Sequence, residues 1–111
     1  RLRLVQGQPV SLHRSYVPCR LAPELLRLDT EKEQLCVLLS QNYHLRMKEC
    51  EETLETASAS SADAELLGIK RGFPLLCLED VIYAENRLPY EYTQVLFRGD
   101  KIKISFHYRA D

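Results

Sequence analysis

Hydrophobic and polar residues alternate at the start of the chain, in RLRLVQGQPVSLHRSY. Leu2 and Leu4 share one face of the first run, and Val10 and Leu12 share one face of the second. Two alternating runs around a glycine-containing turn predict a β-hairpin. A three-residue loop, residues 6–8, places the apolar residues of the two strands opposite each other. A two-residue loop would instead place leucines opposite polar residues. We therefore expect the three-residue loop.

The same register aligns polar residues on the other face of the hairpin. Arg3 lies opposite Ser11, and Arg1 lies opposite His13. This face is either a solvated outer face or a binding surface. Composition alone favours the solvated face, because arginines are ordinary on one side of an antiparallel sheet.

Local signals predict two helices in the middle of the chain. Thr30 and Glu33 have the spacing of a capping box, and the helical pattern that follows stops near Tyr43. Ser61 is a suitable N-cap for a second, short helix that Gly68 would end.

Residues 44–59 predict a long, half-exposed strand, because their apolar density is low and their alternation is long. Three acidic residues in this segment, Glu49, Glu51 and Glu52, raise the question of a metal site. Glu49 and Glu51 share a face of the strand, while Glu52 points away. We therefore expect a solvated face and no metal ion.

The last part of the chain, 73–108, predicts three more strands, joined by turns at 85–87 and 98–100. Gly99 is explained by the second of these turns. The order of the elements predicts an α+β fold, in which helices pack on a mostly antiparallel sheet.

Composition limits what the chain does by itself. Its 111 residues, 45% of them hydrophobic, fit a single domain, 1–111. A net charge of −1 gives no electrostatic footprint of a nucleic-acid binder, so we expect this chain alone not to bind DNA. The chain begins inside a strand-like segment, so we expect more protein before Arg1.

The four cysteines are widely separated, form no C-x-x-C pair and have no matching histidine spacing. This pattern favours free thiols in a reducing cytoplasm over a zinc site or a redox pair. No apolar run approaches the roughly 20 residues of a membrane span. We therefore expect a cytoplasmic protein with no cofactor and no membrane contact.

Several short motifs follow one another along most of the chain. They are an opening Arg-x-Arg followed by a turn and a proline, the passage LLGIKRGFPLLCLE, and LPYEYTQVLFRGDK. In this order the sequence resembles the UTRA effector-binding domain of GntR-type transcription regulators of the HutC subfamily. The resemblance implies a chorismate-lyase-like fold, a winged helix-turn-helix domain before Arg1, and a homodimer formed mainly through the UTRA part.

The resemblance also implies an effector pocket. In members that bind sugar phosphates, the pocket is lined by two arginines of the first strand and by the glutamate of a Leu-Pro-x-Glu stretch, which match Arg1, Arg3 and Glu91. Guanidinium groups suit an anionic ligand because they offer forked donors to phosphate or carboxylate. Glu91 would accept hydrogen bonds from ligand hydroxyls or an amine. The alternative role for Glu91 is a structural ion pair with an arginine across the sheet.

The chain departs from the sugar-phosphate binders at several positions. His13 replaces a second carboxylate, and Gln34 and Cys36 replace a serine and a tyrosine of the helix. Asp80 stands where many members carry an arginine. The anion-binding half of the pocket is thus retained, and the sugar-recognising half is not. The expected effector-binding residues are Arg1, Arg3, His13, Gln34, Cys36 and Glu91.

We therefore expect the effector-sensing and dimerisation domain of a bacterial transcriptional regulator, with no catalytic residues. An anionic effector, either a sugar phosphate or a carboxylate-bearing metabolite, would alter DNA binding by the separate winged-helix domain, with a coupling of about 1 to 3 kcal/mol. The alternative is a chorismate-lyase-like enzyme in which Arg1, Arg3 and Glu91 act on a dianionic substrate. A protein-interaction module without a small-molecule pocket is a third alternative.

Overall fold

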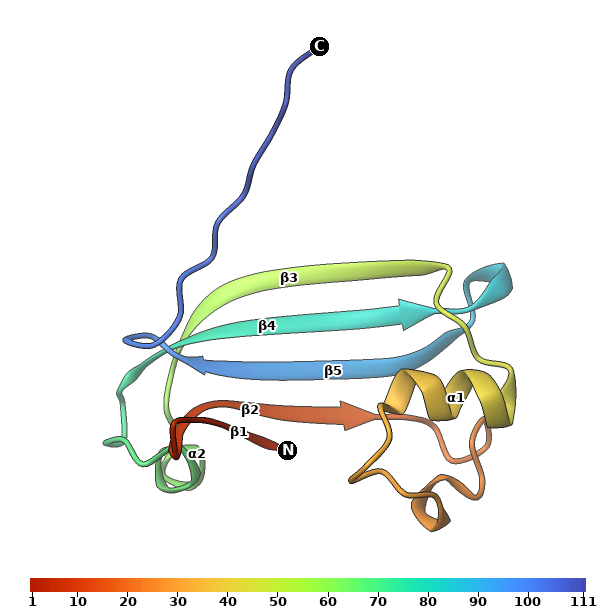
Figure 1. Cartoon of the computed structure of the whole chain (residues 1–111), viewed down its shortest axis with the longest axis horizontal. Coiled ribbons are helices and arrows are strands. Elements are labelled where there is room, and N and C mark those ends of the chain that lie inside the picture. Colours follow the sequence, from red (N-terminus) through yellow and green to blue (C-terminus); the bar gives the residue numbers. More distant parts are fainter. The chain divides into compact units, whose positions relative to one another are not determined.

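Five strands form one sheet in the computed structural model, which describes residues 1–111. The strand order is β1-β2-β5-β4-β3, so β1 and β3 are the outer strands (Figure 1). The antiparallel sheet and its two α-helices confirm the predicted α+β class. In chain order, the elements are β1 (Leu2–Val5), β2 (Gln8–Tyr16), η1 (Leu25–Arg27), α1 (Leu35–Tyr43), β3 (Glu49–Ser58), α2 (Ser61–Leu67), β4 (Pro74–Tyr83), η2 (Glu85–Arg87) and β5 (Pro89–Arg98).

The β1–β2 hairpin turns over two residues, not over the three predicted. Gln6 and Gly7 form the loop, and Val5 pairs with Gln8. Both loop residues have positive φ, 51° for Gln6 and 78° for Gly7. A type I′ turn requires positive φ at both central residues, and its twist matches that of the flanking strands. Turn geometry therefore outweighs the loop length that the hydrophobic pattern favoured.

A β-bulge reconciles the short turn with the hydrophobic pattern. Leu4 lies opposite Pro9 rather than opposite Val10, which corrects the predicted pair. The irregularity falls between Arg3 and Leu4, and Val10 is the extra residue on the partner strand. Beyond the bulge, the predicted pairs Leu2–Leu12 and Arg3–Ser11 are present.

The first helix, α1, does not begin at Thr30 as the capping box predicted. Gln34 precedes the helix with an extended backbone, φ −68° and ψ 138°, which interrupts any helix running through it. Asp29 caps a separate turn, because its Oδ1 accepts a hydrogen bond from the backbone N–H of Lys32 at 3.1 Å. The predicted end of this helix is confirmed.

The second helix, α2, follows the prediction apart from its N-cap. The hydroxyl of Ser60, rather than of Ser61, accepts a hydrogen bond from the backbone N–H of Asp63 at 3.1 Å. Gly68 ends the helix as predicted, with a left-handed φ of 66°. Neither α-helix has the length and apolar character that a membrane crossing requires.

The strand after α1 is shorter than predicted, because β3 begins at Glu49 and not at His44. His44 has a φ of 56° and ends α1 in the left-handed conformation, which a strand does not accommodate.

Two strands follow α2, rather than the three predicted, because residues 102–111 form no regular structure. Ile104, Phe106 and Tyr108 alternate along this tail and are exposed. In Figure 1 the tail continues from β5 without running beside another strand. Alternation produces a strand only where a neighbouring strand supplies hydrogen bonds, and none does so here.

The chain divides into two compact units. The first unit comprises residues 1–13, 55–77 and 95–111, and the second comprises residues 14–54 and 78–94. Each unit has a hydrophobic cluster of its own, and each cluster includes buried residues of one α-helix.

A fully buried leucine lies in each of these clusters. Leu67 of α2 packs in the first unit with Leu12, Ala64, Leu75, Cys77 and Leu96. Leu39 of α1 packs in the second unit with Ala22, Leu45 and Tyr90. Burying such a side chain stabilises the folded state by about 2 kcal/mol relative to leaving it exposed.

Candidate functional site

In the first unit, the β1–β2 hairpin gathers four polar residues, Arg1, Arg3, Ser11 and His13, which we call the hairpin group. Arg1 and His13 exchange backbone hydrogen bonds, both of 2.7 Å, which confirms the predicted opposition. Ser11 is fully buried, and its hydroxyl lies 3.0 Å from Nε2 of His13. Both arginines are exposed. The group therefore presents two guanidinium groups beside a positioned imidazole.

The surroundings of the His13 imidazole disfavour its protonated form. Burial lowers its pKa from 6.5, and the positive charges of Arg3 and Arg1 lower that pKa further. Phe97 of β5 packs its ring against the imidazole at 6.4 Å between centroids, with 74° between the planes. An anion bound beside the two arginines would oppose these causes and raise the pKa of His13.

In the second unit, Glu91 of β5 carries a half-buried carboxyl group. Burial raises its pKa, a hydrogen bond with Ser15 lowers it, and repulsion by Asp80 raises it again. Glu91 forms no ion pair with an arginine or lysine, so the structural role considered from the sequence has no partner in this chain.

Three further acidic groups lie together in the second unit. Cys50 and Glu52 come from β3, Asp80 comes from β4, and one possible ligand atom from each lies within 4.8 Å of the others. We call these three residues the acidic cluster. Asp80 accepts a hydrogen bond from Thr93 through Oδ2 at 3.5 Å, while its buried Oδ1 has no hydrogen-bond partner.

Asp80 raises the pKa of the other two groups of the acidic cluster. The pKa of Glu52 is raised first by a hydrogen bond to Asp80 that favours its protonated form, and then by repulsion from Asp80. Burial, followed by repulsion from Asp80 and Glu52, raises the pKa of the Cys50 thiol. No lysine or arginine forms an ion pair with Glu52 or Asp80.

The two expected residues of the first helix lie at its exposed start. Gln34 is the N-cap residue of α1, and the Sγ of Cys36 lies 3.7 Å from its Oε1. Tyr90, which is buried in the second core, has its pKa raised by burial first and then by Glu91, Cys36 and Cys50. Tyr90 thus lies close to two of the expected effector residues, although the sequence did not single it out.

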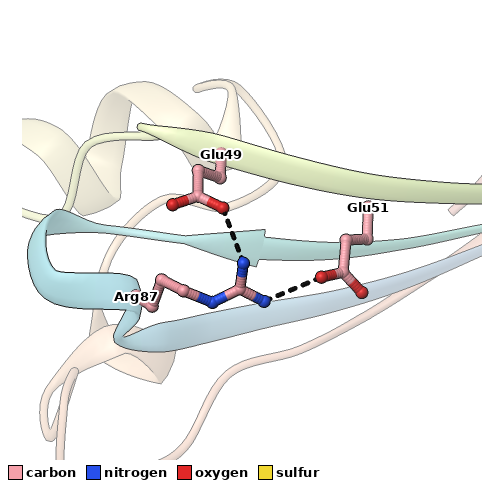
Figure 2. Close-up of polar contacts among 3 residues, drawn as sticks. All are labelled: Glu49, Glu51 and Arg87. Carbon is pink, nitrogen blue, oxygen red and sulfur yellow. Dashed lines mark hydrogen bonds and ion pairs between the residues drawn. The ribbon is translucent and has the colours of Figure 1, made fainter.

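The acidic residues on the opposite face of β3 have a structural role. Glu49 and Glu51 share a face, as predicted, and both bind the guanidinium of Arg87, at 2.9 and 2.8 Å (Figure 2). Arg87 also lies over the ring of Tyr83, at 4.6 Å from its centroid. All three members of the ion-pair network are exposed, so we assign it to the surface and not to the effector site.

An open cleft of about 490 Å³ also lies in the second unit. Its lining residues are His44, Leu45, Arg46, Lys48, Ala84, Glu85 and Leu88. None of the residues expected to bind the effector lines this cleft. Lys48 is paired with Glu85 at 3.4 Å, which partly neutralises the charge of its wall.

A family model, that of the UTRA domain, matches residues 1–103. The chain belongs to the UTRA domain family. This confirms the family inferred from the order of the sequence motifs.

Two curated relatives of this UTRA domain come from Bacillus subtilis. The HTH-type transcriptional repressor NagR is 27% identical over 101 residues, which are 91% of this chain and 41% of that protein. The HTH-type transcriptional regulator GmuR is 26% identical over 105 residues, which are 95% of this chain and 44% of that protein. The chain therefore spans less than half the length of these relatives.

Solved structures show the same fold. The C-terminal domain of Yurk from Bacillus subtilis has a TM-score of 0.92 at 16% identity, covering 97% of this chain and 74% of that chain. The C-terminal domain of the histidine utilization repressor from Pseudomonas syringae has a TM-score of 0.87 at 20% identity, covering 98% and 75%. The ligand-binding domain of a putative GntR-family transcriptional regulator from Bordetella bronchiseptica has a TM-score of 0.75 at 26% identity, covering 97% and 67%.

The two curated relatives are named as transcriptional regulators, and the Bordetella bronchiseptica structure is named as the ligand-binding domain of a GntR-family regulator. This is the class predicted from the sequence, and neither curated relative is named as a lyase.

The six residues expected to bind the effector fall into two sets. Arg1, Arg3 and His13 belong to the first unit, whereas Gln34, Cys36 and Glu91 belong to the second. Backbone hydrogen bonds join Arg1 and His13 in the first set, and a hydrogen bond joins Cys36 and Gln34 in the second. Glu91 and Cys36 both act on the pKa of Tyr90. Their role in binding an effector stays a prediction.

Proposed function

We propose that this UTRA domain binds a small anionic effector and forms a homodimer. Effector binding then alters the DNA affinity of a winged-helix domain in the same cytoplasmic protein. The observation that carries the proposal is the hairpin group, in which two exposed arginines share a strand face with a histidine that a buried serine contacts at 3.0 Å.

The chemistry of the hairpin group supports an anionic ligand. A guanidinium group offers forked donors that fit phosphate and carboxylate oxygens. Arg1 and Arg3 stand on the same strand face, and the imidazole of His13 adds a donor or acceptor according to its tautomer. A phosphorylated sugar or a carboxylate-bearing metabolite matches these donors.

In the second unit, Glu91 is suited to a ligand that carries hydrogen-bond donors. Glu91 has no ion-pair partner, and a half-buried carboxylate is stabilised when it accepts hydrogen bonds. We propose that it accepts them from ligand hydroxyls or an amine. Gln34 and Cys36 would contribute polar contacts from the start of α1.

Dimerisation is supported by the apolar tail, residues 102–111. Its alternating residues Ile104, Phe106 and Tyr108 are exposed, with Phe106 at 72% and Tyr108 at 85% exposure. The outer strands β1 and β3 each offer one edge with unpaired backbone groups. We propose that the tail pairs with a strand edge of a second copy, where its apolar side chains become buried.

The effector proposal is tested by melting the domain with a panel of phosphorylated sugars, dicarboxylates and amino acids. A ligand at about 100 times its dissociation constant adds about 2.7 kcal/mol of stability. The parent is compared with Arg3→Ala, Glu91→Gln and the control Arg71→Ala, which removes an exposed arginine of the same unit as Arg3.

An anionic compound is expected to raise the melting temperature of the parent and of the Arg71→Ala control. The shift should fall by at least half in the Arg3→Ala and Glu91→Gln variants. The proposal is contradicted if no anionic compound stabilises the parent, or if one stabilises all four proteins equally.

A further inference from the structure

We propose that the open cleft of the second unit is a binding site for a small amphipathic carboxylate, a molecule with one carboxylate group and a short aliphatic body. The cleft volume of about 490 Å³ lies within the range of roughly 300 to 1,000 Å³ that is usual for small-molecule sites. The site goes beyond the effector proposal and does not depend on it, because no residue expected to bind the effector lines the cleft.

Backbone hydrogen bonds hold both walls of the cleft. One wall is the connection from α1 to β3, and the other is the turn from β4 to β5. The N–H of Lys48 donates to the carbonyl of Tyr83 at 2.8 Å, which joins the first wall to the end of β4. The N–H of Ala84 donates to the carbonyl of Leu88 at 2.8 Å, which closes the turn. The cleft is therefore formed before a ligand arrives, and a preformed site lowers the cost of binding.

The turn from β4 to β5 keeps an uncommon backbone conformation. Asn86 and Arg87 both have left-handed φ values, 60° and 53°. Such conformations persist where the surrounding contacts impose them. Arg87 supplies contacts of this kind through its ion pairs with Glu49 and Glu51 (Figure 2). The ion-pair network thus joins this wall of the cleft to β3.

The apolar part of the lining is suited to a short aliphatic chain. Leu45 is buried, and Ala84 and Leu88 are half-buried. All three belong to the hydrophobic cluster of the second unit or pack against it. Each methylene group of a ligand that is fully buried here strengthens binding by about fourfold.

The basic part of the lining is suited to a carboxylate. His44, Arg46 and Lys48 line the cleft together with one acidic residue, Glu85. His44 and Arg46 form no ion pair in this chain. Arg46 donates from Nε to the hydroxyl of Ser40 at 3.2 Å, so the two terminal nitrogens of its guanidinium stay available for a ligand oxygen.

Glu85 limits the affinity of the cleft for an anion. Its carboxylate lies 3.4 Å from Nζ of Lys48, and both side chains are more than half exposed. An exposed pair of this kind contributes little stability, so a ligand carboxylate can replace Glu85 beside Lys48. The lining therefore favours a carboxylate with an apolar body over a neutral molecule and over a bare anion.

The test follows the binding of hexanoate to the 111-residue chain by NMR at constant ionic strength. The methyl signals of Leu45, Ala84 and Leu88 report on the cleft. Hexanamide, in which a neutral amide replaces the carboxylate, tests the need for charge. Sulfate, which has no apolar part, tests the need for an aliphatic body.

Two variants change the charge of the cleft in opposite directions. Arg46→Gln should weaken hexanoate binding about threefold, and Glu85→Gln should strengthen it by about the same factor, which is the size of effect that an exposed charge has on a neighbouring one. Because a damaged fold does not produce tighter binding, Glu85→Gln keeps the proposal falsifiable even if Arg46→Gln disturbs the cleft. Arg20→Gln is the matched control and should bind like the parent, since Arg20 is another exposed arginine of the same unit.

The proposal is overturned if hexanoate leaves the three methyl signals unchanged, or if hexanamide or sulfate shifts them as strongly at the same concentration. It is equally overturned if Arg46→Gln does not weaken binding or Glu85→Gln does not strengthen it. Arg3→Ala distinguishes this site from the hairpin group and should leave the hexanoate affinity unchanged. A loss of hexanoate binding in Arg3→Ala would assign the ligand to the hairpin group instead of the cleft.

Discussion

At the scale of single residues, the burial of Glu91 makes the stability of the folded chain depend on pH. Its pKa is raised above 4.5 in the folded chain, mainly by burial. Between 4.5 and the folded value, the folded state holds a proton that the unfolded state has lost. Stability therefore falls as the pH rises through this window.

Replacing Glu91 by glutamine removes this titration and keeps an oxygen for the hydrogen bond with Ser15. The variant is expected to melt at a higher temperature than the parent at about pH 7, with a difference that shrinks towards about pH 4. Glu55→Gln, at an exposed position of β3, is the control and should show no such pH dependence. A difference that stays constant across this range would show that Glu91 titrates normally.

Gly99 shows a second effect at the residue scale, a close approach between backbones. Its N–H donates to the carbonyl of Pro74 at 3.0 Å, and a Cβ at this position would lie 2.7 Å from that oxygen. The sequence explains Gly99 by its place in a turn. The close approach of the Pro74 carbonyl is a second reason for a glycine at this position.

Gly99→Ala is expected to destabilise the fold by about 1 to 3 kcal/mol, because the backbone must shift to admit the methyl group. Gly68→Ala is the comparison: its site is open, and its left-handed φ alone costs about 1 kcal/mol. Urea unfolding of both variants measures the two costs. If Gly99→Ala unfolds like the parent, the close contact with Pro74 is not a constraint.

At the scale of elements, local sequence signals correctly predicted where the helices end. The end of α1 and the glycine stop of α2 followed the sequence. The start of α1 did not, because Asp29 caps an isolated turn and Gln34 is extended. Capping-box spacing marks a turn that can begin a helix, but packing decides whether the helix continues.

The tail is the element whose behaviour depends on a partner. Its alternation predicted a strand, and residues 102–111 have no neighbour to pair with in one chain. If the tail pairs with a second copy, Phe106→Ser should weaken self-association at least about tenfold, since buried aromatic side chains contribute strongly to interfaces.

Sedimentation over a range of concentrations measures this effect. Lys101→Ser, at an exposed position of the preceding turn, is the control and should associate like the parent. A parent that stays monomeric, or a Phe106→Ser variant that dimerises like the parent, would show that the tail does not form the interface.

At the scale of the whole molecule, fold and family could be predicted from the sequence, because alternation, turns and motif order are local properties. The acidic cluster could not be predicted, because Asp80 is brought to Cys50 and Glu52 by the pairing of β3 with β4. The search for a metal site from the sequence considered Glu49, Glu51 and Glu52 together, and two of these belong to the opposite face. The side-chain alternation of β3 alone would have paired Cys50 with Glu52.

The central claim, that an anion binds at the hairpin group, is tested most directly by the pKa of His13. Titrating the three imidazoles by NMR with and without sulfate, at constant ionic strength, measures it, and the exposed His44 and His107 serve as internal references. Without sulfate, we predict a pKa of His13 below 6.5; with sulfate, we predict that the pKa of His13 rises. An unchanged pKa of His13, or an equal rise at all three imidazoles, would contradict the claim.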